Sequence, residues 1–281
     1  MPSPKIEVVS ASSFSLDALT VLFNRGFAGY LFQVDSTPEG LSHRLRTENV
    51  DFHASKVALR DGEPSGFAFI ARRGGRSRLA AMGVTEGARR QGLGRMLLHA
   101  VLLDAKNRQG GGDREMRAEV FEDNIAARKL YEGEGFRVLR RLVGRTLPSP
   151  MAQPASLELH DTPIWNQVVS TEALDLPWQL EPETLAVLGA PARVASLDGK
   201  AWALIYGTFP DRIVLRGLYV PPEHRRQRLA TRLIGALASM HSGHAIHFPP
   251  LFPESMAESF FNHLGFKVEA MNQMEMVRDN F

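Results

Sequence analysis

Hydrophobic positions along the first half of the chain follow two periods, one typical of helices and one typical of strands. Leu93, Met96, Leu97, Ala100 and Val101 recur at the spacing of one helical face, which predicts an amphipathic helix there. Similar patterns predict helices over Leu16–Phe27, Pro38–Thr47 and Ile125–Glu132, and strands over Ile6–Val9, Lys56–Arg60, Gly66–Ala71, Arg78–Val84, Glu115–Phe121 and Arg137–Arg145. Strands interleaved with helices predict an α/β sandwich around a mixed sheet.

A proline-rich stretch from Leu147 to Ala155 interrupts these patterns near the middle of the chain. It contains Pro148, Pro150 and Pro154 and little apolar content, which is typical of a linker. The chain of 281 residues is also longer than one ordinary domain. We therefore predict two domains, at residues 1–147 and 156–281.

Two phrases of the first half recur in the second half in the same order. The segment 89–94 (RRQGLG) returns 136 residues later as 225–230 (RRQRLA). The phrase Leu130-Tyr131 with Gly135-Phe136 returns as Phe260-Phe261 with Gly265-Phe266, so Tyr131 and Phe261 are 130 residues apart. Two matches in one order indicate an internal duplication, with six residues fewer between the phrases in the second copy.

The first of these phrases has the layout of a phosphate-binding turn. A strand ends at Val84, a short loop contains Gly92 and Gly94, and a helix follows. The start of a helix offers unpaired N–H groups and a positive dipole to an anion, and glycines let the backbone approach closely. Arg89 and Arg90 add positive charge beside the turn.

Three other interpretations of the segment 89–94 are a Walker loop, a dinucleotide-binding fingerprint and a turn without a ligand. A Walker loop requires Gly-Lys-Ser/Thr, but Arg95 follows Gly94. A dinucleotide fingerprint requires a third glycine where Leu97 stands. A tight turn with solvated arginines and no ligand stays open from this segment alone.

Two motifs together give the first half a family resemblance. Arg89-x-x-Gly92-x-Gly94 resembles the Q/R-x-x-G-x-G/A motif of the GNAT (GCN5-related N-acetyltransferase) superfamily. Residues 124–136 resemble its second signature, N-x-x-A-x-x-x-Y-x-x-x-G-F, through Asn124, Ala127, Tyr131, Gly135 and Phe136. The resemblance covers most of residues 1–146 and, more loosely, 157–275. It implies two tandem GNAT-like domains, each a mixed, mostly antiparallel sheet flanked by helices.

The resemblance also implies roles for individual residues, with acetyl-CoA (CoA) as the cofactor. Asn124 would bind the cofactor arm, and Tyr131 would stand near its sulfur. The backbone of the strand end would pair with the pantetheine arm, and the turn would wrap the pyrophosphate. These two segments contribute Met82, Gly83, Val84, Arg89, Arg90, Gln91, Gly92, Leu93, Gly94 and Arg95.

Attack of an amine on a thioester leaves a thiolate that benefits from a proton, and a phenol can supply it. Tyr131 is the candidate acid, against the alternative of a half-buried aromatic on an amphipathic helix. In family members that resemble the ribosomal-protein alanine N-acetyltransferases, a glutamate lies five residues before the asparagine, and Glu119 occupies that position. An exposed strand glutamate is an equal alternative. Weaker candidates for the base are Glu122, Asp123 and Asp35, and His99 is interpreted as structural.

The second copy departs from the motifs at three positions. Arg228 replaces the first glycine, Phe261 replaces the tyrosine, and Glu254 occupies the position of Asn124. A long side chain, a lost hydroxyl and a negative charge each oppose binding or turnover of an anionic thioester. We predict that this domain is degenerate and non-catalytic, although Arg225 and Arg226 leave CoA binding open.

The composition of the chain bears on its cysteine chemistry, its partners and its location. Cysteine is absent, which excludes disulfides and thiolate chemistry, and a net charge of +2 does not indicate a nucleic-acid partner. No apolar run approaches the roughly 20 residues of a membrane span, and residues 1–5 lack a secretory signal pattern, so we expect a cytoplasmic protein without a membrane partner. No metal site is expected, because His241, His244 and His247 lie where a helix ends and a strand begins.

The leading hypothesis is an acetyl-CoA-dependent N-acetyltransferase that acts by direct attack in a ternary complex. The alternative is a protein that binds or senses acyl-CoA without chemistry. The acceptor, a small-molecule amine or a protein or peptide amine, stays open at this point. Candidate segments for its selection are the loop of residues 30–35, the last strands and the second half of the chain.

Overall fold

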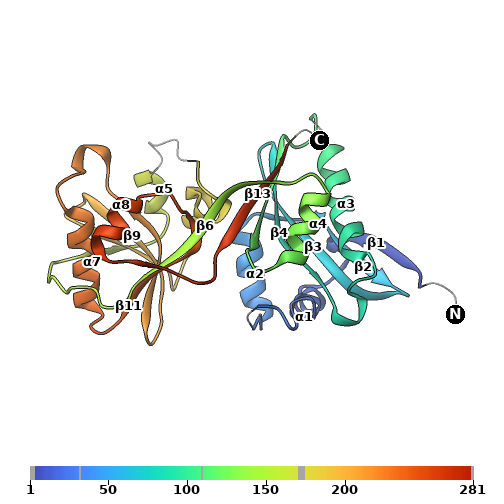
Figure 1. Ribbon diagram of the computed structural model, residues 1–281, viewed down its shortest axis with the longest axis horizontal. Coiled ribbons are helices and arrows are strands. Elements are labelled where there is room, and N and C mark those ends of the chain that lie inside the picture. The colour runs from blue at the N-terminus through green and yellow to red at the C-terminus, as the bar shows by residue number, and fades with distance from the viewer. Residues whose placement is uncertain (1–3, 32, 109, 170–174, 280–281) are drawn as a thin grey trace. The chain divides into compact units, whose positions relative to one another are not determined.

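The structure is a computed structural model that describes residues 4–31, 33–108, 110–169 and 175–279. Residues 1–3, within the segment 1–5 that lacks a secretory signal pattern, and residue 32, within the predicted acceptor loop at residues 30–35, therefore lie outside the described residues. The chain forms two compact units, residues 1–139 with 274–281, and residues 140–273. Both are α/β units with a sheet between helices, as the sequence predicts (Figure 1).

The sheet of the first unit has the strand order β1-β2-β3-β4-β5-β13, followed by the start of β6. The strands are β1 (Ile6–Ser10), β2 (Val50–Arg60), β3 (Glu63–Arg73), β4 (Arg76–Val84), β5 (Glu115–Phe121), β6 (Arg137–Leu147) and β13 (Gln273–Asp279). Pairing of β4 with β5 is parallel, while β1 to β4 pair antiparallel. The helices are α1 (Leu16–Gly26), α2 (Pro38–Thr47), α3 (Leu93–Lys106) and α4 (Ile125–Gly133).

Strand β3 shows how the two faces of this sheet are covered. Phe67 and Phe69 pack against Phe23 of α1, with ring centroids 5.5 and 6.2 Å from it. Ala68 and Ile70 point to the other face and belong to the core that contains Leu97 of α3. The strand is buried on both faces, which explains its nearly continuous apolar sequence.

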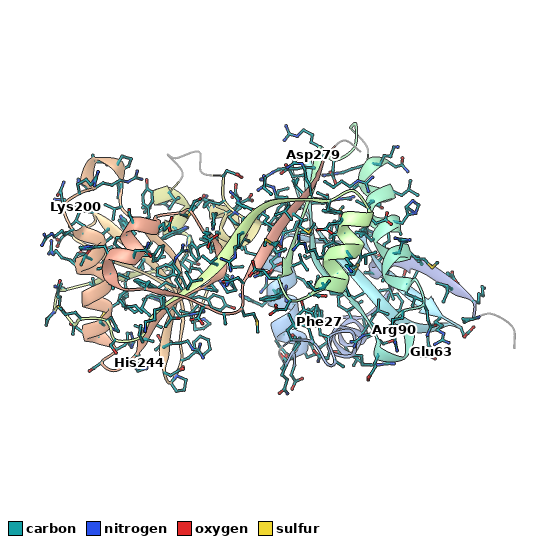
Figure 2. The ribbon with its side chains drawn as sticks, viewed as in Figure 1. Phe27, Glu63, Arg90, Lys200, His244 and Asp279 are labelled. Atoms are coloured by element: carbon teal, nitrogen blue, oxygen red, sulfur yellow. The ribbon has the colours of Figure 1, made fainter. Side chains whose placement is uncertain are left out.

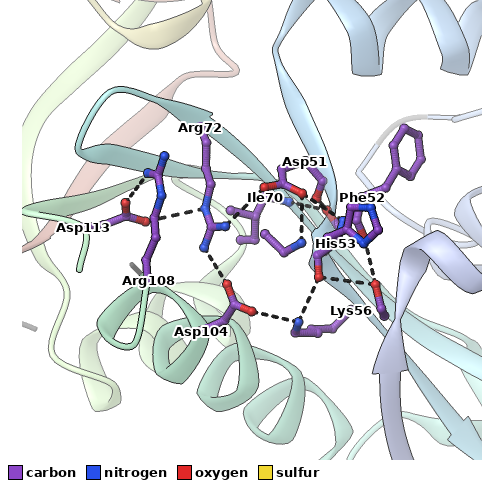
Figure 3. A network of polar contacts seen from close by, with 12 residues as sticks. Asp51, Phe52, His53, Lys56, Ile70, Arg72, Asp104, Arg108 and Asp113 are labelled. Carbon is purple, nitrogen blue, oxygen red and sulfur yellow. Dashed lines mark hydrogen bonds and ion pairs between the residues drawn. The ribbon is translucent and has the colours of Figure 1, made fainter. Parts of the chain in front are cut away.

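An ion-pair network ties β2 and β3 to α3 at one end of this unit (Figure 3). Arg72 lies 3.2 Å from Asp51 and also contacts Asp104, which in turn lies 3.1 Å from Lys56. These residues do not line the cavity of the first unit, so we infer that their ion pairs stabilise the fold.

The second unit repeats the arrangement with the strand order β6-β11-β10-β9-β8-β7, and β12 also pairs with β6. Its strands are β7 (Glu158–His160), β8 (Arg193–Leu197), β9 (Ala201–Thr208), β10 (Arg212–Tyr219), β11 (Ala245–Pro253) and β12 (Lys267–Val268). Its helices are α5 (Ile164–Val169), α6 (Pro182–Leu185), α7 (Leu229–Met240) and α8 (Glu258–Leu264). Again one strand pair, β10 with β11, is parallel.

The boundaries of the compact units differ from the predicted ones at residues 147 and 156. Strand β6 begins in the first unit and continues in the second, where it lies between β11 and β12. Strand β13, red in Figure 1, returns to the first unit and lies next to β5. Each unit thus takes one strand from the other half of the chain. Of the predicted linker, Leu147 belongs to β6, and residues 148–155 contain no helix or strand.

In the part of the chain that the structure describes, no helix is long and apolar enough to span a membrane.

Candidate active site

A separation of β4 from β5 creates the site in the first unit. The parallel pairing runs from Arg76–Glu115 to Leu79–Ala118 and stops, although β4 continues to Val84 and β5 to Phe121. At that point the register of β3 against β4 shifts by one residue, so that Ala80 is bulged. A bulge bends its strand and ends regular pairing. The end of β4 consequently keeps β3 as its partner, and its other edge faces an opening.

The turn between β4 and α3 has a backbone suited to an anion. Arg90 and Gly92 have φ angles of 59° and 82°, in the left-handed region. Gly92 is the N-cap of α3, and no side chain caps the first N–H groups of this helix. A Cβ on Gly92 would meet no atom within 4 Å, so the space beside it is open. Backbone N–H groups at a helix start and a nearby cation make a ready anion site.

A cavity of about 470 Å³ extends from this turn along the opening. Most of the predicted cofactor residues line it, and Phe27 and Arg90 on its wall are labelled in Figure 2. The lining residues are Gly26, Phe27, Gly29, Tyr30, Leu31, Met82, Gly83, Val84, Ala88, Arg89, Arg90, Gly92, Leu93, Gly94, Asp123, Asn124, Ala126, Ala127 and Leu130.

Gly26 and Gly83 bring α1 close to the end of β4 at the cavity wall. A Cβ on Gly83 would lie 2.8 Å from the ring of Phe67 and 3.2 Å from the backbone of Gly26. Only glycine permits this approach, which the motifs in the sequence do not predict. Nothing in a single sequence marks two distant glycines as neighbours.

The side chains of Arg89 and Gln91 stabilise the turn by donating hydrogen bonds to backbone carbonyl groups. Arg89 Nε donates to Val84 O at 3.0 Å, and its Nη2 donates to Gly26 O and Ala28 O at 3.2 and 2.6 Å. Gln91 Nε2 donates to Gly87 O at 3.0 Å. The positive charge of Arg89 is therefore directed at carbonyl groups, while the sequence suggested that it lies beside a phosphate.

Arg95 lies on the first turn of α3, in an ion pair with Glu134 (3.2 Å) and with a side chain that is 67% exposed. Among the described residues, Gln91 and Arg95 do not line the cavity.

Asn124 connects the two sides of the opening. Its Oδ1 caps α4 by accepting from Ala127 N at 3.1 Å, and its Nδ2 lies 3.4 Å from the hydroxyl of Tyr30. Tyr30 follows α1, and its ring contacts Phe27 and Phe121 edge-on. Burial raises the pKa of the Tyr30 phenol, and the contact with Asn124 opposes this. The sequence placed Tyr30 in the acceptor loop but did not place its hydroxyl at Asn124.

Tyr131 is buried, with 6% of its surface exposed, and packs against Phe136 at 5.8 Å between ring centroids. Burial, and then the nearby Tyr30 and Glu119, raise the pKa of its phenol above the usual value. It therefore keeps its proton at neutral pH. Tyr131 is not among the described residues that line the cavity.

Glu119 lies on the same face of β5 as Phe121, as the predicted alternation requires, but it is not exposed. Its Oε2 lies 2.7 Å from Arg78, whose Nη1 lies 2.6 Å from Glu48. Oε1 is buried and has no hydrogen-bond partner among the residues that the structure describes. Burial raises the pKa of Glu119, Arg78 opposes this, and Glu275 and Glu48 add to the rise. The expectation of an exposed strand glutamate is therefore wrong, and the role of base stays a prediction.

The weaker candidates are more exposed. Asp35, His99 and Asp123 are exposed, and Asp123 also lines the cavity. Glu122 is half-buried.

The second unit retains the backbone of the turn and the side chains of Arg225, Arg226 and Gln227, but not its two glycines. Arg226 and Arg228 have φ angles of 65° and 58°, and Arg225 Nε donates to Val220 O at 2.9 Å, as Arg89 does to Val84. The bulge also recurs, at Arg216 of β10. This agreement at the level of single bonds supports the duplication.

The positions of the predicted catalytic groups differ in the second unit. Phe261 is buried under the guanidinium of Arg145, 4.7 Å from the ring centroid. Glu254 pairs with Arg141 at 2.7 Å. Tyr219 occupies the position of Gly83 and is buried in a core with Trp165. In the second unit, side chains thus occupy the position at which Gly83 lets α1 approach β4 in the first unit.

His241, His244 and His247 of the second unit lie from the end of α7 to the start of β11. His241 caps the end of α7, and His247 on β11 lies 2.8 Å from the hydroxyl of Thr146. Among the described residues, no three potential ligands gather in a metal-binding group.

Comparison with known proteins agrees with this geometry. Residues 19–136 match the model of the acetyltransferase (GNAT) family. No curated protein sequence matches the chain significantly.

Solved structures resemble the chain over nearly its whole length. A GCN5-related N-acetyltransferase from Sphaerobacter thermophilus matches with a TM-score of 0.65 and 13% identity, covering 98% of this chain and 95% of the other. A tandem GNAT protein from the clavulanic acid biosynthesis pathway matches with 0.64 and 16%, covering 98% of both chains. A GCN5-related N-acetyltransferase from Anabaena variabilis matches with 0.66 and 14%, covering 98% and 73%. At such identities the likeness concerns the fold.

The family match lies on the unit that carries the cavity, and the fold match extends through both units. Residues 19–136 therefore match the acetyltransferase (GNAT) family, and the chain as a whole has the fold of a tandem GNAT protein.

Proposed function

We propose that the first unit binds acetyl-CoA in the cavity and transfers its acetyl group to a primary amine by direct attack in a ternary complex. The observation that supports this most strongly is the opening between β4 and β5, which leads directly to the left-handed turn at the start of α3. The family match supports acyl transfer in general, and the cavity supports the CoA thioester as the donor.

The residues present fit such a cofactor. The backbone at Gly92, Leu93 and Gly94, together with the charge of Arg90, would hold the pyrophosphate. The uncovered edge of β4 at Met82–Val84 would pair with the pantetheine arm, and Asn124 would contact it from the opposite wall. The open space beside Gly92 is the local feature that a larger side chain would remove.

Acetyl-CoA supplies an acyl group activated as a thioester. Tyr131 stays protonated at neutral pH and would donate a proton to the leaving sulfur. Glu119 would accept the proton of the incoming amine through its unpartnered Oε1 or through a water molecule. A backbone N–H near Val84 would stabilise the charge that develops on the carbonyl oxygen.

The second unit would not catalyse transfer. Phe261 lacks the hydroxyl of Tyr131, and Tyr219 occupies the position of a glycine in the cavity wall. Arg228 keeps the left-handed turn but has a long side chain at the position of Gly92. We propose that this unit supports the first unit without carrying out chemistry.

The test is thiol release from acetyl-CoA with a panel of primary amines that includes both small molecules and peptide N-termini. The proposal expects amine-dependent release with at least one class, together with acetylated product by mass spectrometry. Tight binding of acetyl-CoA with no release across the panel would instead favour a protein that senses acyl-CoA.

A further inference from the structure

The guanidinium of Arg89 bridges two segments that form opposite parts of the cavity wall. One is the end of β4, where Arg89 donates to Val84 O. The other is the end of α1 and the loop of residues 27–31, where it donates to Gly26 O and Ala28 O. Its Nη1 also lies 3.9 Å from the position that a Cβ on Gly29 would occupy.

These acceptors suit an arginine for two physical reasons. Gly26 O belongs to the last turn of α1, whose carbonyl groups have no partner within the helix and carry the negative end of its dipole. The planar guanidinium can donate in several directions at once from one rigid group. A lysine ammonium at the same position could not reach both segments with fixed geometry.

The 27–31 loop presents Tyr30 to the opposite wall. Amides within the loop are hydrogen-bonded, since Ala28 N donates to Arg25 O and Tyr30 N donates to Phe27 O. From this short turned segment the Tyr30 hydroxyl lies 3.4 Å from Asn124 Nδ2. A change in the anchoring of the loop would therefore displace this hydroxyl.

We propose that Arg89 is a positioning residue: it anchors the 27–31 loop to the end of β4 and so holds the Tyr30 hydroxyl against Asn124. Arg89 thereby links the segment that leads into the phosphate turn to the loop on the acceptor side. Its consequence for turnover rests on the proposed acetyl transfer, whereas the anchoring itself does not.

Hydrogen exchange of the protein without ligand tests the anchoring directly. In Arg89→Met, exchange at the amides of Ala28 and Tyr30 should rise about tenfold or more, while the amides of α3 keep their protection. Arg89→Lys should fall between Arg89→Met and the unaltered protein. Unchanged exchange in the 27–31 loop, or an equal rise through α3, would overturn the proposal.

Arg225→Met is the matched control, because Arg225 makes the same bond to Val220 in the second unit. It should leave exchange in the 27–31 loop unchanged. Failure of the unaltered protein to turn over acetyl-CoA would contradict the proposed function. It would not contradict the anchoring role of Arg89, which the exchange measurement tests separately.

Kinetics separate positioning from cofactor binding. Arg89→Met should lower kcat or raise the amine KM about tenfold, with acetyl-CoA affinity changed by less than about threefold. Arg90→Met, which removes a cation on the cavity wall, should do the reverse and weaken acetyl-CoA binding. Equal losses of acetyl-CoA affinity in both variants would show that Arg89 acts on the cofactor and would overturn the positioning role.

Discussion

Arg78 and Glu119 form an ion pair of 2.7 Å in which only 3% and 4% of the two side chains are exposed. Arg78 is held from its other side by Glu48 at 2.6 Å, and these two carboxylates raise the pKa of Arg78 although burial lowers it. The pair occupies one carboxylate oxygen of Glu119 and leaves Oε1 without a hydrogen-bond partner among the described residues. Glu119 is thus held in a fixed position by Arg78, and it is not among the described residues that line the cavity.

Replacing Glu119 by Gln should lower kcat/KM by about 10² or more, because a positioned general base contributes roughly this factor. A base must be deprotonated, and burial raises the pKa of Glu119 above its ordinary 4.5. Activity of the unaltered protein should therefore fall as pH decreases through a value above 4.5. A pH profile of kcat/KM should show this fall, and Glu119→Gln should lack it.

Glu115→Gln is the control for this variant, since Glu115 lies on the same face of β5 and pairs with Arg117 at 2.9 Å. It should retain near-normal activity. An unchanged acid limb in Glu119→Gln would remove Glu119 from the mechanism.

Replacing Tyr131 by Phe should lower kcat by about 10² at neutral pH, because the proton donor to the sulfur is lost. Affinity for CoA should stay nearly unchanged, since only the hydroxyl is removed and the ring keeps its packing against Phe136. Rapid-quench turnover combined with calorimetry measures both quantities. Retention of full kcat would exclude the role of acid and direct attention to Tyr30.

Replacing Gly83 by Ala should destabilise the first unit by about 1–3 kcal/mol, because the new Cβ would lie 2.8 Å from Phe67 and 3.2 Å from the backbone of Gly26. Urea unfolding measures the change. Gly87→Ala is the matched control: its Cβ would meet nothing within 4 Å, and the effect should stay within about 0.5 kcal/mol. Equal stability of the two variants would contradict the tight contact of α1 with β4.

Replacing Asp51 by Asn should lower the melting temperature of the first unit by a few degrees at neutral pH. Burial raises the pKa of Asp51, but backbone N–H groups of Ala54 and His53 and the charge of Arg72 outweigh it and lower the pKa below 3.8 (Figure 3). A lowered folded pKa stabilises the fold above the unfolded pKa and ceases to do so as pH falls through the folded value. The difference between variant and unaltered protein should therefore vanish in acid. A difference that persists below pH 3 would assign the effect to packing.

The local elements could be predicted because their signals are local. Helix α2 begins at Pro38 after the Thr37 cap and ends at Thr47, as predicted, and β5 follows its alternation from Glu115 to Phe121. The phosphate turn could be located because glycines and arginines recur there in both copies. Strands β2 and β3 are longer than predicted because buried polar and small residues, such as Ser55, extend them without an apolar signal.

The remaining features depend on contacts between segments far apart in the sequence. The positions of β6 and β13 follow from pairing partners that no single strand reveals. The burial of Glu119 depends on Arg78 and Glu48, which lie 41 and 71 residues before it. The orientation of Arg89 depends on the end of α1. A motif locates such side chains along the chain, but it does not determine which way they point.

Calorimetric titration with acetyl-CoA tests the central claim most directly, because it counts sites as well as measuring affinity. The account predicts one site per chain, abolished by Gly92→Val, which fills the open space beside the turn, and unaffected by Arg228→Ala. Two sites per chain would contradict the assignment of the second unit, and no binding at all would contradict the proposed acetyl transfer.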